Sequence, residues 1–338
     1  MIDLLVAGAG PAGAATAIRA ALAGLSVVVV EPRSSPIDKA CGEGIAWSAT
    51  EYLGRLGVRL EGRPFYGIRY LDADHAVDAR FRAGPGLGVR RTTLQRALAD
   101  RLAELDIPVI PTRVEAITQT LNSVTAAGIT AHYLAAADGL HSPIRRQLSL
   151  GVAGSEEPRR GLRQHFLVRP WCDLVEVYWS ALGEAYVTPV ADDLVGVAIL
   201  TSARGSFDSH LDAFPALKRR LAGATPATPV LGAGPLRQRV RGRVAGRVML
   251  VGDAAGYVDA LTGEGIAVAL RTSAELVRCV QADRPAEYEA AWRRVSWECR
   301  FLTGSLLWAR NRSLLAPRIV PAAARLPGVF GAIVNQLT

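Results

Sequence analysis

The chain has 338 residues, of which half are hydrophobic and 21% are charged, and its formal net charge is +8. This length and composition suit an α/β protein with one large or two ordinary domains and ample core. The positive charge comes almost entirely from scattered arginines, since Lys39 and Lys218 are the only lysines, so no basic stripe indicates a nucleic-acid-binding protein.

The four cysteines are too widely spaced to suggest a shared site. Cys41, Cys172, Cys279 and Cys299 form neither a paired metal-ligand pattern nor a disulfide framework, so we expect no metal and a reducing cytoplasm. The apolar start of the chain lacks the basic region of a secretion signal. No uninterrupted apolar stretch is long enough to cross a bilayer.

The first elements predict a nucleotide-binding turn. An apolar strand over Met1–Ala7 leads into the sequence GAGPAG and an alanine-rich helix from Pro11 to about Leu22. Strand, glycine turn and helix in this order are typical of the dinucleotide fingerprint. In that fingerprint Gly8 permits the turn, Gly10 lets the backbone approach a pyrophosphate, and Gly13 lets the helix pack closely on the strand.

The next strand, Ser26–Val30, ends in a candidate ribose ligand. Glu31 lies eighteen residues after Gly13, where a carboxylate can accept hydrogen bonds from ribose hydroxyls. The alternative is an alanine- and glycine-rich core hairpin followed by a surface glutamate.

The middle of the chain changes from mixed helix and strand to strands in succession. The elements expected first are a loop containing Cys41-Gly42-Glu43-Gly44, a helix over Trp47–Leu56, strands over Tyr66–Leu71 and Val77–Phe81, a helix over Thr92–Glu104, and strands over Val109–Ile117 and Val124–Leu134. Four strand-like runs follow, over Arg163–Val168, Leu174–Trp179, Ala185–Val190 and Leu194–Leu200. Consecutive strands bounded by turn residues predict an antiparallel sheet.

This change of pattern predicts a second domain inserted into the first. We assign residues 1–64, 91–158 and 238–338 to a nucleotide-binding domain with C-terminal helices, and residues 65–90 and 159–237 to a substrate-binding β-sheet domain. The late part of the first domain is expected to contain a strand over Arg247–Val251 and helices over Gly265–Val280 and Ala286–Leu307.

Three motifs in one order carry a family resemblance. The succession of GAGPAG, DGLHSPIRR and GDAAGYVDALTGEGI resembles the para-hydroxybenzoate hydroxylase-like flavoprotein superfamily, and Asp38-Lys39-Ala40-Cys41-Gly42-Glu43-Gly44 looks like its geranylgeranyl reductase-related branch. The resemblance implies an α/β fold, with a Rossmann-like FAD-binding domain of the glutathione reductase type and an inserted antiparallel β-sheet domain. It also implies FAD as cofactor, with NADPH or NADH as electron donor.

The resemblance carries cofactor contacts over to particular positions. Asp138 and Asp253 also have an alternative role as helix caps, and Arg33 could instead be a solvated surface residue. The residues expected to contact FAD are Gly8, Gly10, Pro11, Ala12, Gly13, Glu31, Arg33, Cys41, Gly42, Arg91, Val114, Asp138, Gly139, Gly252, Asp253, Gly263, Gly265 and Ile266.

The reaction favoured by the sequence is hydroxylation. Members of this superfamily pass oxygen from a flavin hydroperoxide to an electron-rich substrate in a dry apolar pocket. Alternation places Val175, Val177 and Trp179 on one strand face, and Tyr186 and Thr188 on another, with few ionisable groups. The catalytic candidates are Cys41, Tyr186, Trp179 and His165, each of which could instead be structural. An aromatic or lipophilic substrate, such as an alkylphenol or polyketide, is expected.

Three other functions stay open. Reduction of isoprenoid double bonds is the main alternative, although the Trp-x-Phe-Pro element of the reductases is replaced by Tyr186-Val187-Thr188-Pro189. A halogenase is less expected, because its Trp-x-Trp-x-Ile element and dedicated lysine are missing. A non-enzymatic flavoprotein partner is the third.

The apolar C-terminal tail is expected to be a broken helix, because prolines interrupt it. Leu314 to Leu337 also contains Arg318 and Arg325, a composition that suits either a peripheral membrane contact or a cover over an apolar substrate. Packing onto the nucleotide-binding domain is the alternative. The oligomeric state stays open.

Overall fold

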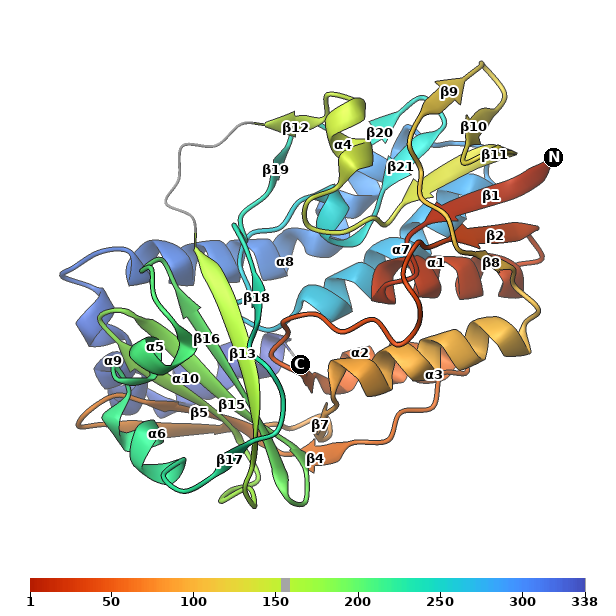
Figure 1. Ribbon diagram of the computed structural model, residues 1–338. Helices are drawn as coiled ribbons and strands as arrows, with labels where there is room; N and C mark the ends of the chain where they lie inside the picture. Colours follow the sequence, from red (N-terminus) through yellow and green to blue (C-terminus); the bar gives the residue numbers. More distant parts are fainter. Residues whose placement is uncertain (153–158, 338) are drawn as a thin grey trace.

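A computed structural model describes residues 1–152 and 159–337 of the protein. Figure 1 shows two large sheets, one at the upper right and one at the lower left, with helices packed around them. The predicted fold class, an α/β FAD-binding fold with a mixed parallel sheet and an antiparallel sheet, is confirmed.

The first sheet is built around buried parallel strands. Its strand order is β20-β21-β11-β1-β2-β8, and β1 pairs in parallel with both β2 and β11. Short apolar runs form the central strands because both faces of the sheet are covered there, whereas the edge strand β8 is exposed. The strands are β1 (Ile2–Ala7), β2 (Val27–Val30), β8 (Val109–Ile110), β11 (Ile129–Ala136), β20 (Val244–Ala245) and β21 (Val248–Leu250).

Helices cover this sheet and complete the larger hydrophobic core. The alanine-rich helix α1 packs against both α3 and α7, and α7 packs in turn against α8. Small side chains at Ala14, Ala15 and Ala17 are fully buried, which lets the helix lie close to its neighbours. The helices on this side are α1 (Pro11–Leu22), α2 (Trp47–Arg55), α3 (Arg91–Glu104), α4 (Pro143–Gln147), α7 (Gly265–Gln281) and α8 (Glu287–Arg310).

The second sheet is antiparallel except where β14 lies parallel to β5. Its order is β17-β13-β16-β15-β14-β5-β6, and β18 also pairs with β13. Helices α5 (Phe207–Leu211) and α6 (Pro215–Arg220) cover one face. The strands are β5 (Gly67–Leu71), β6 (Ala76–Arg80), β13 (Arg160–Leu167), β14 (Val175–Ser180), β15 (Gly183–Ala191), β16 (Leu194–Thr201), β17 (Thr225–Pro226) and β18 (Leu231–Ala233).

Two small sheets join these parts. One has the order β3-β7-β4 and the other pairs β12 with β19. Their strands are β3 (Gly44–Ile45), β4 (Arg63–Phe65), β7 (Gly86–Gly88), β12 (Gly151–Val152) and β19 (Arg239–Val240).

Two strand predictions were wrong. The expected strand over Val124–Leu134 is a hairpin of β10 (Val124–Ala126) and β11, with positive φ at Ala127 and Gly128. Such a two-residue turn normally contains Asn-Gly or Asp-Gly, so the sequence lacked the usual signal. The expected strand over Val109–Ile117 is interrupted between β8 and β9 (Ile117–Gln119). Pro111 lies in the interruption and has no N–H for a ladder hydrogen bond.

The tail packs on the second sheet. It consists of η2 (Ala316–Arg318), α9 (Ile319–Arg325) and α10 (Pro327–Leu337), a broken helix as expected from its prolines. Phe330 and Val334 of α10 are buried against Val77 and Ala79 of β6. From the sequence we assigned these helices to the nucleotide-binding domain. In the structure they pack on β6, where side chains alternate between the two faces and Val77 and Ala79 form an apolar surface for the tail.

Candidate functional site

The glycine turn between β1 and α1 has the conformation that the fingerprint requires. Gly8 has a φ of +107°, and a Cβ there would lie 2.5 Å from the Ala137 carbonyl oxygen. A Cβ at Gly13 would lie 1.8 Å from the Gly8 carbonyl oxygen. A Cβ at Gly10, in contrast, would meet nothing within 4 Å. The first and third glycines are therefore required by the protein itself, and the second leaves open space at the start of α1.

The carboxylate at the end of β2 is bound to this turn. Glu31 is 3% exposed, and its Oε2 accepts the Ala9 N–H at 3.0 Å. Burial alone would raise the pKa of Glu31, but hydrogen bonds from Arg33 and from Ala9 outweigh it and hold the pKa below its ordinary value. Arg33 lies beside Glu31, with Nε 2.8 Å from Oε1. Both predicted residues thus lie at the nucleotide turn, already paired to each other.

A glutamine that the sequence analysis missed completes the turn. Gln95 of α3 is 1% exposed and donates to the Ala9 carbonyl oxygen at 2.8 Å. Its Oε1 is buried and has no hydrogen-bond partner within the described part of the chain. Gln95 follows Arg91 by one helical turn, so the two side chains share a face of α3. The four-residue spacing from Arg91 is the sequence signal that could have identified Gln95 as a site residue.

The middle and late motifs meet through an arginine that the sequence analysis did not select. Arg145 of α4 donates to the carbonyl oxygens of Leu140 and Ala254 at 2.8 and 3.0 Å. Asp138 accepts the Ile144 N–H at 3.0 Å, so it does cap this helix region, and burial raises the pKa of its carboxyl group. Its other oxygen, Oδ1, has no partner among residues 1–152 and 159–337. Asp253, at the start of η1 (Gly252–Ala255), forms an ion pair with Lys39 at 3.0 Å.

The loop that contains Cys41 is clamped by the second sheet. Glu43 is buried, accepts the Arg91 N–H at 2.8 Å, and contacts His165 Nε2 at 2.6 Å. Thr188 donates to the Gly42 carbonyl oxygen at 2.7 Å. Arg163 of β13 binds Asp38 in the same loop. The loop is therefore held against the second sheet at both of its ends.

The catalytic candidates fall into different surroundings. His165 is fully buried between Glu43 and Thr228, and the Tyr186 hydroxyl donates to the Leu261 carbonyl oxygen at 2.6 Å. Trp179 packs on Tyr70, with ring centroids 5.2 Å apart. Cys41 is half-buried, and its sulfur accepts the Glu43 N–H at 3.4 Å. Of the four, Cys41 lies in the loop beside the late motif.

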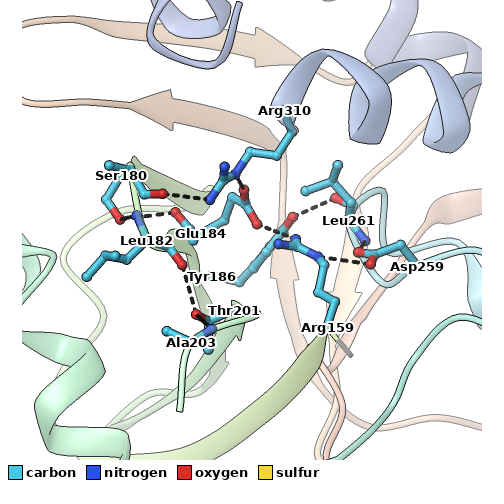
Figure 2. Close-up of polar contacts among 12 residues, drawn as sticks. Arg159, Ser180, Leu182, Glu184, Tyr186, Thr201, Ala203, Asp259, Leu261 and Arg310 are labelled. Carbon is cyan, nitrogen blue, oxygen red and sulfur yellow. Dashed lines mark hydrogen bonds and ion pairs between the residues drawn. The ribbon is translucent and has the colours of Figure 1, made fainter. Parts of the chain in front are cut away.

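The predicted apolar face exists, but it also contains charges that the sequence analysis did not expect. Val175, Val177 and Trp179 pack with Leu261 and with apolar residues of α8 and α9. On the same face of β15 as Tyr186, Glu184 is completely buried. Figure 2 shows it bound by Arg159 and Arg310, while Arg159 also binds Asp259 at 2.9 Å. The expectation of few ionisable groups was therefore wrong, and this network anchors the loop that precedes α7.

A cavity of about 390 Å³ adjoins the late motif, between α7 and α8. Asp253, Tyr257 and Gly265 line one side, and Cys299 and Thr303 of α8 line the other.

Within the described ranges, no cluster of His, Cys, Asp or Glu is arranged to hold a metal, and no helix has the length and apolarity needed to span a membrane.

The residues between the glycine turn and the start of α7 fit a bound FAD. A Cβ at Gly10, Gly42, Gly139 or Gly263 would meet no atom beyond its neighbours within 4 Å. Gln95 Oε1 and Asp138 Oδ1 are the buried, unpartnered oxygens already described. The start of α1 presents free N–H groups and the positive end of the helix dipole to a pyrophosphate. Val114 packs at the edge of the main core, and Ile266 lies in the first turn of α7.

Comparison with known proteins identifies the family. Residues 1–179 match the profile described as FAD binding domain, which is more than half of the chain. The chain belongs to this FAD-binding family. The family is that of the para-hydroxybenzoate hydroxylase-like flavoproteins, as the sequence motifs suggested, and the protein is an FAD-dependent oxidoreductase.

Curated relatives of this flavoprotein include two kinds of reductase. It is 29% identical over 300 residues to digeranylgeranylglycerophospholipid reductase 1 of Methanothermobacter thermautotrophicus, covering 78% of this chain and 73% of that protein. It is 28% identical over 325 residues to menaquinone reductase of Mycolicibacterium smegmatis, covering 86% and 79% respectively.

Solved structures of similar fold include halogenases. The flavin-dependent brominase Bmp2 has a TM-score of 0.84 at 17% identity, covering 99% of this chain and 93% of that one. The flavin-dependent halogenase CmlS has a TM-score of 0.81 at 19% identity, covering 91% of this chain and 64% of CmlS. At these identities the likeness concerns the fold alone.

Replacing Asp253 with alanine is expected to weaken flavin binding at least about tenfold, because hydrogen bonds to a carboxylate contribute roughly 1.5–3 kcal/mol. The chain should stay folded, since Asp253 and Lys39 are both about one-third exposed. Flavin retention after gel filtration measures the effect, with Asp192→Ala, an almost fully exposed carboxylate, as the control. A Lys39→Met variant that loses flavin equally would assign the effect to the lysine instead.

Proposed function

We propose that this flavoprotein reduces carbon–carbon double bonds in the isoprenoid chain of a prenyl lipid or prenylated quinone. The observation that carries the proposal is its similarity, over most of the chain, to reductases named for digeranylgeranylglycerophospholipid and for menaquinone. These relatives support the alternative named in the sequence analysis better than they support hydroxylation. The two halogenases share only the fold, so they do not favour halogenation.

Saturating one double bond consumes two electrons and two protons. FAD, when bound and reduced by NADPH, NADH or another donor, supplies the two electrons. The described residues provide a cradle for the nucleotide, an apolar surface from β14 and β15, and a loop fixed between them. An apolar chain leaves water with a favourable free energy when it enters such surroundings.

Cys41 is the residue that we propose to contact the substrate. Its sulfur accepts the Glu43 N–H, and that bond leaves the S–H proton available. The position of Glu43 is fixed, because His165 and the Arg91 N–H bind its carboxylate. Tyr186 and His165 act as positioning residues, since their polar atoms contact protein groups.

The test is an anaerobic reaction. The flavin is reduced with NADPH, NADH or dithionite under nitrogen and mixed with a prenylated quinone or a geranylgeranyl lipid, and the products are analysed by mass spectrometry. A product that has gained two hydrogens supports the proposal. A product that gains oxygen, and forms only in air, would establish hydroxylation in its place.

Cys41→Ala is expected to lower kcat about 100-fold if the thiol delivers a proton, which is the usual size of a general-acid contribution. Because Cys41 is also among the residues expected to contact FAD, kcat is expressed per bound flavin, which separates loss of the proton from loss of the cofactor. Cys172→Ala is the matched control, because Cys172 is also half-buried but lies in the loop before β14. An unchanged kcat in Cys41→Ala would remove the thiol from the mechanism.

A further inference from the structure

Helix α8 has an aromatic outer face that no described element covers. Trp297, Phe301 and Trp308 are 61%, 54% and 56% exposed. Their spacings of four and seven residues place them on one side of the helix. Trp297 and Phe301 stack on each other, with ring centroids 5.3 Å apart. Large aromatic side chains are costly to leave in water, so several of them on one exposed side of a helix mark an interaction surface.

The opposite side of the same helix faces the site. Thr303 and Leu307 are buried, and Cys299 and Thr303 line the cavity beside the late motif. Arg310, at the C-terminal end of α8, binds Glu184 of β15. The helix thus separates the outer aromatic face from the interior of the protein by a single layer.

The stretch of sequence that contains the aromatic face is rich in arginine. Residues 290–325 contain seven arginines and a single carboxylate, Glu298. Arg293, Arg294 and Arg310 are paired with glutamates. The arginines with no carboxylate within 4 Å in the described ranges are Arg300, Arg312, Arg318 and Arg325. Of these, Arg300 lies over the Trp292 ring and lines the cavity, so it belongs to the inner side of α8. The Arg312 guanidinium lies over the Trp308 ring, 4.9 Å from its centroid. Aromatic rings flanked by unpaired cations suit the interface of an anionic bilayer.

We propose that this surface, Trp297, Phe301 and Trp308 with Arg312 and Arg318, docks the protein on an anionic membrane. The aromatic rings would enter the headgroup region, and the guanidinium groups would contact lipid phosphates. The charge excess favours an acidic lipid surface over a second copy of this chain, because two copies would bring like charges together. The inference about docking does not depend on the proposed reaction. If that reaction is correct, docking would bring the protein to the membrane that contains its substrate.

The test is vesicle flotation of the full chain with FAD bound and no substrate. We expect the protein to float with phosphatidylcholine vesicles that contain phosphatidylglycerol, and to bind about tenfold less to phosphatidylcholine alone. The triple variant Trp297→Ala, Phe301→Ala, Trp308→Ala should lose at least about tenfold in binding. The charge variant Arg312→Gln, Arg318→Gln should lose its preference for the anionic vesicles.

Matched controls replace equally exposed residues elsewhere. Leu121→Ala with Leu182→Ala removes exposed apolar side chains, and Arg59→Gln with Arg219→Gln removes exposed charges; both should bind like the natural protein. Thermal unfolding checks that every variant is folded.

Two results would overturn the proposal. One is a natural protein that does not float with anionic vesicles, or a triple variant that binds as well as it does. The other is a dimer, seen by light scattering, that the aromatic substitutions abolish while no vesicle binding is found. Turnover of a short, detergent-soluble prenyl substrate without vesicles is measured separately, so failure of the proposed reaction can be told from failure of docking.

Discussion

Replacing Gly13 with alanine is expected to destabilise the protein by about 3 kcal/mol or more and to abolish flavin binding. The new Cβ would lie 1.8 Å from the Gly8 carbonyl oxygen and 3.1 Å from Ala137 Cβ. The nearest atom belongs to the backbone of the turn that directly follows β1, so α1 would have to move away from β1 as a whole. Denaturant unfolding measures the stability, and flavin absorbance measures the binding.

Gly10→Ala is expected to separate these two effects. Its Cβ would meet no protein atom within 4 Å, and the φ of −65° at Gly10 suits alanine. The variant should therefore fold with nearly natural stability and still lose flavin, because the methyl group would occupy the space for the pyrophosphate. Gly10→Ala with full flavin content would contradict the predicted path of the cofactor.

Gly54→Ala is the matched control for both glycine variants. Gly54 lies within α2, and a Cβ there would meet nothing within 4 Å. Alanine should stabilise this helix by roughly 0.5–1 kcal/mol, because glycine loses more backbone entropy on folding. Flavin binding should not change.

Replacing Glu184 with alanine is expected to cost about 3–5 kcal/mol of stability, the usual effect of removing one member of a buried ion pair. Glu184 is completely buried and binds Arg159 and Arg310. Its removal would leave Arg310 without a carboxylate partner in the described ranges and Arg159 with Asp259 alone. Tyr186 and Arg159 connect this network to Leu261 and Asp259, so flavin affinity should fall as the loop before α7 loosens.

An exposed pair provides the comparison for Glu184. Glu104 is 61% exposed and pairs with Arg101 at 2.8 Å, so Glu104→Ala should cost no more than about 1 kcal/mol. A Glu184→Ala variant with a similarly small cost would show that water reaches the arginines. Flavin loss without any change in stability would mean that Glu184 acts on the loop alone.

Local patterns were enough for the first half of the site. Gly8, Gly10 and Gly13 follow from the backbone geometry of one turn, and Glu31 from the strand that must follow it. Alternation along β14 correctly grouped Val175, Val177 and Trp179, because side-chain direction in a strand repeats every two residues. The same kind of local signal was absent at Ala127–Gly128, and there the prediction of a single strand was wrong.

The pairing of buried charged residues could not be predicted from local sequence patterns. Glu43 meets His165 from 122 positions away, and Arg310 meets Glu184 from 126 positions away. Neither residue of such a pair has a periodicity or spacing that points to its partner. Burying a charge without a partner costs so much free energy that each buried charge must be paired. Only the packing of the two sheets decides which residue is the partner.

The sequence by itself determined the family, the cofactor and the nucleotide turn, because each depends on the steric needs of a few adjacent residues. Tertiary structure alone decided how the flavin loop is clamped, where the tail helices pack, and which side of α8 faces solvent. The first two depend on contacts between segments more than a hundred residues apart, and the third depends on packing against α7 and on the pair of Arg310 with Glu184. The free energy of these contacts appears only when the sheets and helices are assembled.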